Sequence, residues 1–191
     1  MNNNNTNHNK KEYTITAYSE NHIGLLNRIT VIFTRRHVNI ESLTVSASAI
    51  DGIHKFTIVV YETEEKVKKI VNQIEKLVEV LKAFYHTNDE IVYQEIALYK
   101  VPTESLLDST NVEETVRKHN ARILEITRDY TIIEKTGHKE ETQELLDELR
   151  PYGVKQFTRS GRIAVTKHSQ ELLTEFLKEN DARAELGIVN I

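Results

Sequence analysis

The spacing of apolar residues switches repeatedly between a period of two and a period of 3.6, and this alternation constrains the fold more than any other feature. Strict alternation is typical of a half-buried strand, and the longer period is typical of a helix with one buried face. The first half of the chain gives six predicted elements: strand 11–18, helix 25–36, strand 38–49, strand 53–61, helix 67–78 and strand 80–87. The order β-α-β-β-α-β predicts an antiparallel sheet with both helices on one face, the ferredoxin-like α+β fold.

Local signals support these boundaries. Asp51-Gly52 is a strong hairpin turn signal between the second and third strands. Thr63 precedes the second helix, as is typical of a helix start. Apolar residues fall on even positions up to Ile40 and on odd positions from Leu43. This change in the alternation predicts a β-bulge in the second strand.

The second half repeats this element order without a visible repeat of sequence. Its predicted elements are strand 93–101, helix 112–119, strands 123–128 and 130–135, helix 140–150, strands 154–158 and 162–166, and a last helix at 170–178. We therefore expect two ferredoxin-like domains, at 11–88 and 91–167, with an acidic break at 88–90. The Asn-rich residues 1–10 are expected to be a disordered tail, and 168–191 a helical extension.

Composition excludes several classes of function. The formal net charge of -4 argues against bulk attraction to nucleic acid or to an anionic membrane surface. The chain has no cysteine, so disulfides, thiolate metal sites and cysteine nucleophiles are excluded. It shows neither a secretory signal nor an apolar run of the roughly 20 residues that a membrane helix needs. We expect a soluble cytoplasmic protein.

The sequence also lacks the common catalytic motifs. None of the eight histidines forms the two-His helix pair of zinc enzymes, and there is neither a G-x-S-x-G elbow nor a phosphate loop ending in Gly-Lys-Ser/Thr. With six glycines, no G-x-G-x-x-G dinucleotide turn can be assembled. Acidic runs such as Glu64-Glu65 and Glu140-Glu141 are expected to be solvated helix faces. We expect no catalysis, no metal and no cofactor in this chain.

One segment, Asn21–Leu26 between the first strand and the first helix, suits a small ligand. A helix N-terminus offers unpaired amides and a partial positive charge, which favour a carboxylate. Gly24 has no Cβ and lets a ligand approach the backbone, and Asn21 offers both a donor and an acceptor to a zwitterion. The same residues equally suit a plain helix cap and a tight turn, and Asn39 equally suits a plain turn residue.

The stretch Glu20–Val45 resembles the start of the acetolactate synthase (acetohydroxyacid synthase) small subunit, an amino-acid-binding ACT domain. The matching parts are N-x-x-G-x-L (Asn21, Gly24, Leu26) and, more specifically, N-I-E-S-L-T-V (Asn39 to Val45). Further similarities lie at 73–82, 93–101 and 159–165, so the likeness covers about Tyr13 to Lys167. His37 stands where the family has glycine.

The resemblance implies a regulatory subunit that does no chemistry itself. The family's small subunits dimerise through ACT domains whose sheets join edge to edge, and a branched-chain amino acid, usually valine, binds at that interface. The implied effector residues are Asn21, His22, Ile23, Gly24, Leu25 and Leu26 of one protomer, with Asn39 and Ile40 of its partner. The resemblance further implies a catalytic large subunit that holds thiamine diphosphate, Mg and FAD. This chain would activate that large subunit and make it sensitive to feedback inhibition.

Two other classes fit the same fold. One is a stand-alone ACT-type amino-acid sensor that regulates another enzyme or a transcription factor, although the acidic charge disfavours a DNA-reading helix. The other is a small enzyme on a ferredoxin-like scaffold, because a fold alone does not determine function. The choice among valine, leucine and isoleucine stays open, because an apolar pocket separates one methylene by only about 1–3 kcal/mol.

Overall fold

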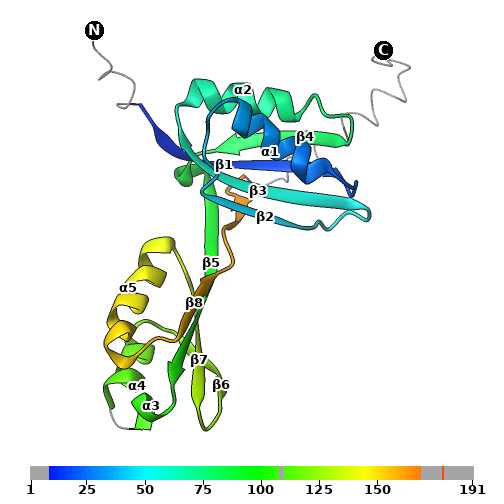
Figure 1. Ribbon diagram of the computed structural model, residues 1–191. Helices are drawn as coiled ribbons and strands as arrows, with labels where there is room; N and C mark the ends of the chain where they lie inside the picture. The colour runs from blue at the N-terminus through cyan, green and yellow to red at the C-terminus, as the bar shows by residue number, and fades with distance from the viewer. Residues whose placement is uncertain (1–8, 108–109, 169–177, 179–191) are drawn as a thin grey trace. The chain divides into compact units, whose positions relative to one another are not determined.

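The computed structural model describes residues 9–107, 110–168 and 178 of the chain (Figure 1). The chain divides into two compact units, one containing the described residues up to Val92 and those from Ala164, the other spanning Tyr93–Ile163. No helix in these described ranges is both long enough and apolar enough to cross a lipid bilayer. The domain ranges 11–88 and 91–167 remain a prediction.

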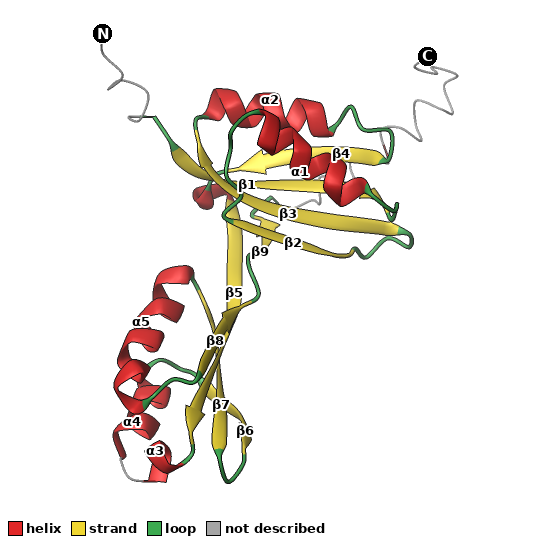
Figure 2. Ribbon diagram, viewed as in Figure 1, coloured by secondary structure: helices red, strands yellow, loops and turns green. Residues whose placement is uncertain are grey.

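The first unit is a four-stranded sheet with two helices. Its elements are β1 (Lys11–Glu20), α1 (Leu25–Arg35), β2 (Ser42–Ala47), β3 (Ile53–Glu62), α2 (Glu64–Ile74) and β4 (Val80–His86). The strand order is β2-β3-β1-β4, all neighbours are antiparallel, and both helices cover one face (Figure 2). This arrangement confirms the predicted ferredoxin-like α+β fold.

The first core explains why these residues form these elements. Alternate residues of β1, including Ile15 at 0% exposed, point toward the helices, as a period of two requires. On α1, Leu25, Ile29 and Phe33 recur every fourth residue and are at most 2% exposed. The buried face of α1 therefore holds the start of this helix in a fixed position on the sheet.

Two boundaries differ from the sequence prediction. The second strand begins at Ser42, so Val38, Asn39 and Ile40 lie before it, and the register of β2 against β3 is unbroken from Ser42 to Ala47. The paired residues of β2 therefore contain no bulge; just before them, the Glu41 amide donates to the carbonyl of Val59, the residue that pairs with Ser42, at 2.9 Å. The parity change arises because Val38, 7% exposed, packs into the core from a loop. His37 in this loop has a φ of 53°, in the left-handed region that glycine adopts most readily.

The second helix also ends earlier than predicted. It stops at Ile74, and Leu77 and Val78 lie in the turn before β4, where the Val80 amide donates to the Leu77 carbonyl at 3.0 Å. Val78 is 95% exposed, so its assignment to the buried helix face is wrong. Thr63 does occupy the N-cap position of α2.

The second unit repeats the same topology. Its elements are β5 (Ile91–Pro102), which begins two residues earlier in the first unit, α3 (Glu104–Leu107), α4 (Thr110–Lys118), β6 (Arg122–Ile126), β7 (Tyr130–Gly137), α5 (Lys139–Leu149) and β8 (Gln156–Arg159), with a short 3-10 turn at Arg150–Tyr152. A 3-10 turn at Asn88–Glu90 and all of β9 (Ile163–Thr166) except its first residue belong to the first unit. The sheet order is β6-β7-β5-β8, and β9 pairs with β5. The short helix α3 was not predicted, and the predicted tail at 1–10 and helix at 170–178 fall mostly outside the described residues.

The second core lies between this sheet and its helices. Tyr99 of β5 and Ile133 of β7 are 0% exposed and pack with Leu145 and Leu149 of α5. The Tyr99 hydroxyl donates to the Thr142 carbonyl at 2.6 Å, which satisfies its polar atom inside the core.

Candidate functional site

The turn from Glu20 to Gly24 is anchored by both loops beside it. The Glu20 amide donates to the Glu79 carbonyl at 3.0 Å, and the Asn21 amide donates to the Gly52 carbonyl at 3.2 Å. These bonds attach the turn to the start of β4 and to the β2–β3 hairpin. The turn is therefore preorganised by backbone contacts that do not use its own side chains.

Gly24 is the N-cap of α1 and has a left-handed backbone, with φ 83° and ψ -5°. A Cβ at this position would have nothing within 4 Å, so the space beside the backbone is open. The first helical bond runs from the Arg28 amide to the Gly24 carbonyl at 3.2 Å. The amides of Leu26 and Asn27 precede that bond and have no partner within the helix.

Neither the N-cap nor the first turn of α1 compensates the partial positive charge at the N-terminus of this helix. Gly24 provides no side-chain cap, and the first turn of α1 contains no acidic residue. By contrast, α2 begins with Glu64 and Glu65, and α5 begins with Glu140 and Glu141. An anion at such a terminus gains about 0.3–1 kcal/mol when exposed and up to ~2 kcal/mol when partly buried. The start of α1 can therefore accept an external carboxylate.

The side chains of the turn divide into exposed and structural ones. Asn21 and His22 are exposed, Ile23 is 99% exposed, and Leu26 is 46% exposed. Leu25 differs, because its side chain is in the core of its own unit and its amide donates to the His22 carbonyl at 3.2 Å. Asn21 and the amides thus supply polar contacts, and Ile23 and Leu26 supply apolar surface.

An ion pair beside the turn was not foreseen from the sequence. Arg28 Nη2 lies 2.6 Å from Glu79 Oε1, and this hydrogen bond holds the pKa of the Glu79 carboxyl below its usual value. The arginine neutralises an acid whose own backbone supports the turn, so the carboxylate does not repel an anion there. No sequence signal could link these two residues, because they meet only through the packing of α1 on the sheet and the pairing of β1 with β4.

Asn39 and Ile40 lie at the other end of α1 from Gly24. This helix has 11 residues, which corresponds to about 16 Å. Asn39 is exposed, and its Nδ2 donates to Glu41 Oε1 at 3.2 Å, while Ile40 packs against the core. One chain therefore does not bring the two predicted halves of the site together. Asn39 and Ile40 directly precede β2. This strand lies at the edge of the first sheet, where its free backbone groups can pair with another chain.

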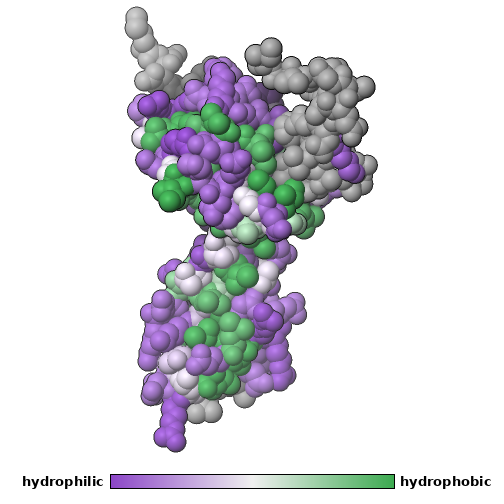
Figure 3. Space-filling model, turned by 90° about the vertical axis from the view of Figure 1, so that its right-hand side faces the viewer, coloured by the Kyte–Doolittle hydropathy of each residue, from purple (hydrophilic) through white to green (hydrophobic). Residues whose placement is uncertain are grey.

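Other parts of the described chain offer weaker candidates. Within residues 9–107, 110–168 and 178, no group of three or more His, Asp or Glu side chains could hold a metal ion. On the second unit, apolar surface is visible in Figure 3, and a hollow of about 160 Å³ is lined by Leu98, Tyr99, Lys100, Tyr130, Ile132, Gln156 and Thr158. Small-molecule pockets usually measure about 300–1,000 Å³. This hollow is too small for such a site.

Comparison with known proteins identifies two matching segments. Residues 94–168 match the family model described as the small subunit of acetolactate synthase, and residues 15–82 match the AHAS small subunit-like ACT domain. The acetolactate synthase small subunit of Bacillus subtilis is 35% identical over 158 residues, covering 82% of this chain and 91% of that protein. A probable acetolactate synthase small subunit of Archaeoglobus fulgidus is 33% identical, covering 84% of this chain and 99% of that protein.

A solved structure has the same architecture. The crystal structure of the acetolactate synthase small subunit from Thermotoga maritima matches with a TM-score of 0.76 and 26% identity. The match covers 84% of this chain and 99% of the Thermotoga chain. The likeness therefore includes both units and not the first alone.

Proposed function

Because this chain belongs to the acetolactate synthase small-subunit family, we propose that it binds a branched-chain amino acid and thereby inhibits the large catalytic subunit that it otherwise activates. The observation that carries the proposal is the open, uncapped and acid-free start of α1 at Gly24. In this role the chain catalyses nothing itself. Thiamine diphosphate, Mg and FAD belong to the large subunit, and the complex works in the cytoplasm.

The turn offers one contact for each part of the effector. The carboxylate meets the amides of Leu26 and Asn27 at the positive end of α1. The Asn21 side-chain carbonyl accepts from the ammonium group. The exposed side chains of Ile23 and Leu26 contact the branched aliphatic group, which favours valine, leucine or isoleucine over polar amino acids.

A homodimer completes this site. Two copies joined along their β2 edges bring Asn39 and Ile40 of one protomer toward the turn of its partner. The support for this arrangement is that Asn39 and Ile40 directly precede the edge strand β2, whereas the Asn21 amide is bonded to Gly52 in the hairpin that follows β2. Within one chain the two halves lie beyond opposite ends of α1, a helix about 16 Å long.

An effector shared by two protomers can change their relative orientation. Control requires two conformations that bind the effector with different affinity, because equal binding would shift neither population. A coupling of about 1–3 kcal/mol gives roughly five- to 150-fold control of the large subunit.

Titration calorimetry tests the binding step directly. The purified chain is titrated with valine, leucine and isoleucine, with aspartate as a polar control of similar size. We expect saturable binding of at least one branched-chain amino acid and none of aspartate. The chain is then mixed with the large subunit, and acetolactate formation is measured with and without the bound amino acid. Absence of binding by all three, or activity that ignores the ligand that binds, would contradict the proposal.

A further inference from the structure

The first sheet has an open face, opposite the one that α1 and α2 cover. Paired residues of antiparallel strands point to the same side of a sheet, so the strand register assigns the residues of this face. They form three rows across the four strands: Ser42, Val59, Thr14 and His86; Thr44, Thr57, Thr16 and Phe84; Ser46, Lys55, Tyr18 and Lys82.

The middle of this open face is buried. Thr14 is 0% exposed, and Tyr18, Thr57 and Val59 are buried as well. His86 Nδ1 is also buried, and within the described part of the chain it has no hydrogen-bond partner. Groups from outside the sheet therefore cover these rows and exclude water. An apolar cover accounts for the nitrogen without a partner, because it offers neither a donor nor an acceptor.

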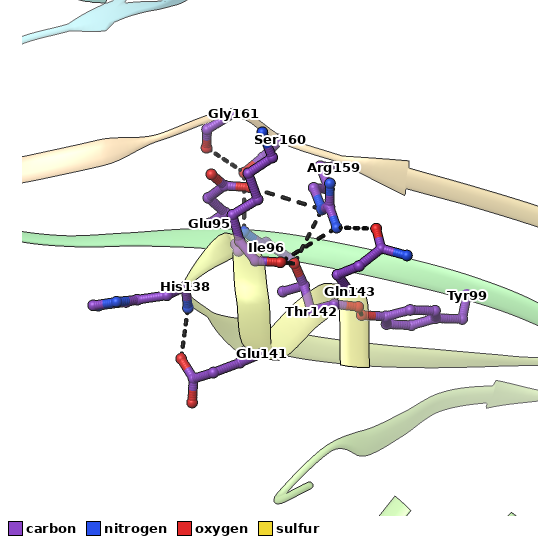
Figure 4. A network of polar contacts seen from close by, with 11 residues as sticks. Glu95, Ile96, Tyr99, His138, Glu141, Thr142, Gln143, Arg159, Ser160 and Gly161 are labelled. Atoms are coloured by element: carbon purple, nitrogen blue, oxygen red, sulfur yellow. Dashed lines mark hydrogen bonds and ion pairs between the residues drawn. The ribbon is translucent and has the colours of Figure 1, made fainter. Parts of the chain in front are cut away.

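The second sheet shows that strands alone do not bury an open face. Figure 4 shows its helix side, where the Tyr99 hydroxyl donates to the Thr142 carbonyl and Arg159 Nε donates to Thr142 Oγ1 at 3.0 Å. Ile96 and Leu98 alternate with Tyr99 along β5 and lie on the opposite face. Ile96 is 41% exposed and Leu98 is half-buried. The burial of the first open face therefore requires a cover that the second sheet does not have.

The end of β9 runs across the open face of the first sheet. The Ala164 carbonyl accepts from Lys55 Nζ of β3 at 2.7 Å. Burial lowers the pKa of His86 on β4, and the nearby His168 adds to this effect. The chain thus passes from β3 toward β4, and at His168 it still lies beside this face.

The sequence after His168 has the pattern expected of a cover. The predicted helix 170–178 has one apolar face, made of Leu172, Leu173, Phe176 and Leu177. At the end of this range, Lys178 is helical and exposed, as expected of the polar side. A helix over 170–178 extends about 13 Å, and a sheet of four strands is about 14 Å across. The match to the small-subunit family model ends at residue 168, so the helix has no counterpart in that model.

We propose that the predicted helix 170–178 packs its apolar face on the open face of the first sheet in the same chain. The chain reaches His168 beside that face, so the helix needs only a short connection to cover it. The open face is then closed to other proteins in the free chain. The edge strand β2 stays available for the proposed dimer.

A single thiol reports this cover, because the natural chain has no cysteine. Thr16→Cys and Thr57→Cys each place a thiol in the middle of the open face. Asn72→Cys, exposed on α2, is the control on the other side of the sheet. Each variant is made in the full chain and in a chain that ends at His168. Its rate of reaction with N-ethylmaleimide is divided by the rate of the same chain unfolded in urea.

We expect the shortened chain to react faster at the open face only. Removal of 169–191 should raise the relative rate at Thr16→Cys and Thr57→Cys at least about tenfold, because reaction no longer requires a local opening. The relative rate at Asn72→Cys should change by less than about twofold.

A charge in the helix tests the same point in the full chain, so the result does not depend on how well the shortened chain folds. Phe176→Glu places a carboxylate on the apolar face and should raise the rate at Thr16→Cys. Thr174→Glu adds the same charge on the polar side of the predicted helix and should leave that rate unchanged.

The alternative covers give different results. Equal rates at the open face in the full chain, the shortened chain and Phe176→Glu would overturn the proposal. Protection of Thr16→Cys that appears only at high protein concentration would assign the cover to a second copy, and protection that appears only with the large subunit would assign it to that partner. Either result overturns the proposal. No effector is used, so the outcome is independent of the proposed function.

Discussion

The two units share one topology but begin their first helices differently. In the first unit, the corner between β1 and α1 is open, with Gly24 in a left-handed conformation and no acid in the first turn. In the second, Thr103 fills the corresponding corner, 7% exposed, with its hydroxyl donating to the Thr127 carbonyl at 2.8 Å. Helix α3 then opens with Glu104. The same fold thus leaves one helix start open and closes the other.

The start of α5 extends this contrast. His138 and Glu141 cap that helix reciprocally, so its amides are satisfied within the chain. At α1, the N-cap is Gly24, which has no side chain that could do the same. A capped terminus contributes stability, and an uncapped one is available to a ligand. The candidate site therefore depends on the absence of a capping side chain and of an acidic residue at the start of α1, and not on the fold.

The largest expected effect tests the open corner. Gly24→Asp places a carboxylate where the effector's own would lie, so valine inhibition of the reconstituted enzyme should be lost while activation remains. The left-handed φ costs an aspartate about 1 kcal/mol, and the space is empty, so the fold should persist. Gly153→Asp, at φ 80° in the second unit, is the backbone-matched control. Inhibition retained by Gly24→Asp, or lost equally in Gly153→Asp, would remove the corner from the site.

A smaller effect is expected at the partner's half of the site. Asn39→Ala should raise the valine concentration for half-inhibition about tenfold, equivalent to ~1.4 kcal/mol. Its bond to Glu41 is exposed, so the melting temperature should hardly change. Asn72→Ala, an exposed asparagine on α2, is the control. A wild-type response in the Asn39 variant would confine the site to one protomer.

Substitutions at the capped start of α5 should lower the stability of the chain and leave its affinity for the effector unchanged. Glu141→Ala removes one arm of the capping box, and the free energy of unfolding measured in urea should fall by about 1 kcal/mol. Glu140→Ala, next to it and without a capping role, should change it by less than about 0.5 kcal/mol. At the uncapped terminus, Asn21→Ala should leave stability unchanged. A clear loss of stability there would contradict the contrast between the two termini.

The smallest effect is a pH dependence confined to the first unit. Burial lowers the pKa of His86 from its usual 6.5, opposed by Glu90 and reinforced by His168 and Lys55. The unfolded chain then binds this proton more readily, so stability is full above about pH 6.5 and declines as the pH falls toward the lowered value. Urea unfolding from pH 7.5 to 5.5 should show a weaker decline for His86→Gln than for wild type or His54→Gln. Equal slopes would show that His86 does not titrate in this range.

Much of the fold follows from periodicity, and the errors show where periodicity fails. The alternation in β1 and the spacing of Leu25, Ile29 and Phe33 reflect burial, and burial coincides with regular structure there. Val38 is also buried but belongs to a loop, and Val78 continues the helical spacing although it is 95% exposed in a turn. Spacing reports which residues are apolar, whereas a strand also needs a partner's hydrogen bonds.

The candidate site was only partly predictable for a related reason. Asn21 and Gly24 lie in one short segment, so their motif is visible in the sequence. The Arg28–Glu79 pair depends on how β1 meets β4, and the closed corner at Thr103 depends on a hairpin some 25 residues away. Whether Asn39 meets the turn depends on a second chain, which no property of one sequence can show.

Because Gly24 and Asn39 lie at opposite ends of α1, each two-fold pair would hold two sites, and each site would take one half from either chain. Chains carrying Gly24→Asp and chains carrying Asn39→Ala are each defective as pure dimers. In a mixed dimer, however, both lesions fall in the same site and the other site is wholly native. Two alleles, one that loses inhibition and one that weakens it, would then complement each other when co-expressed.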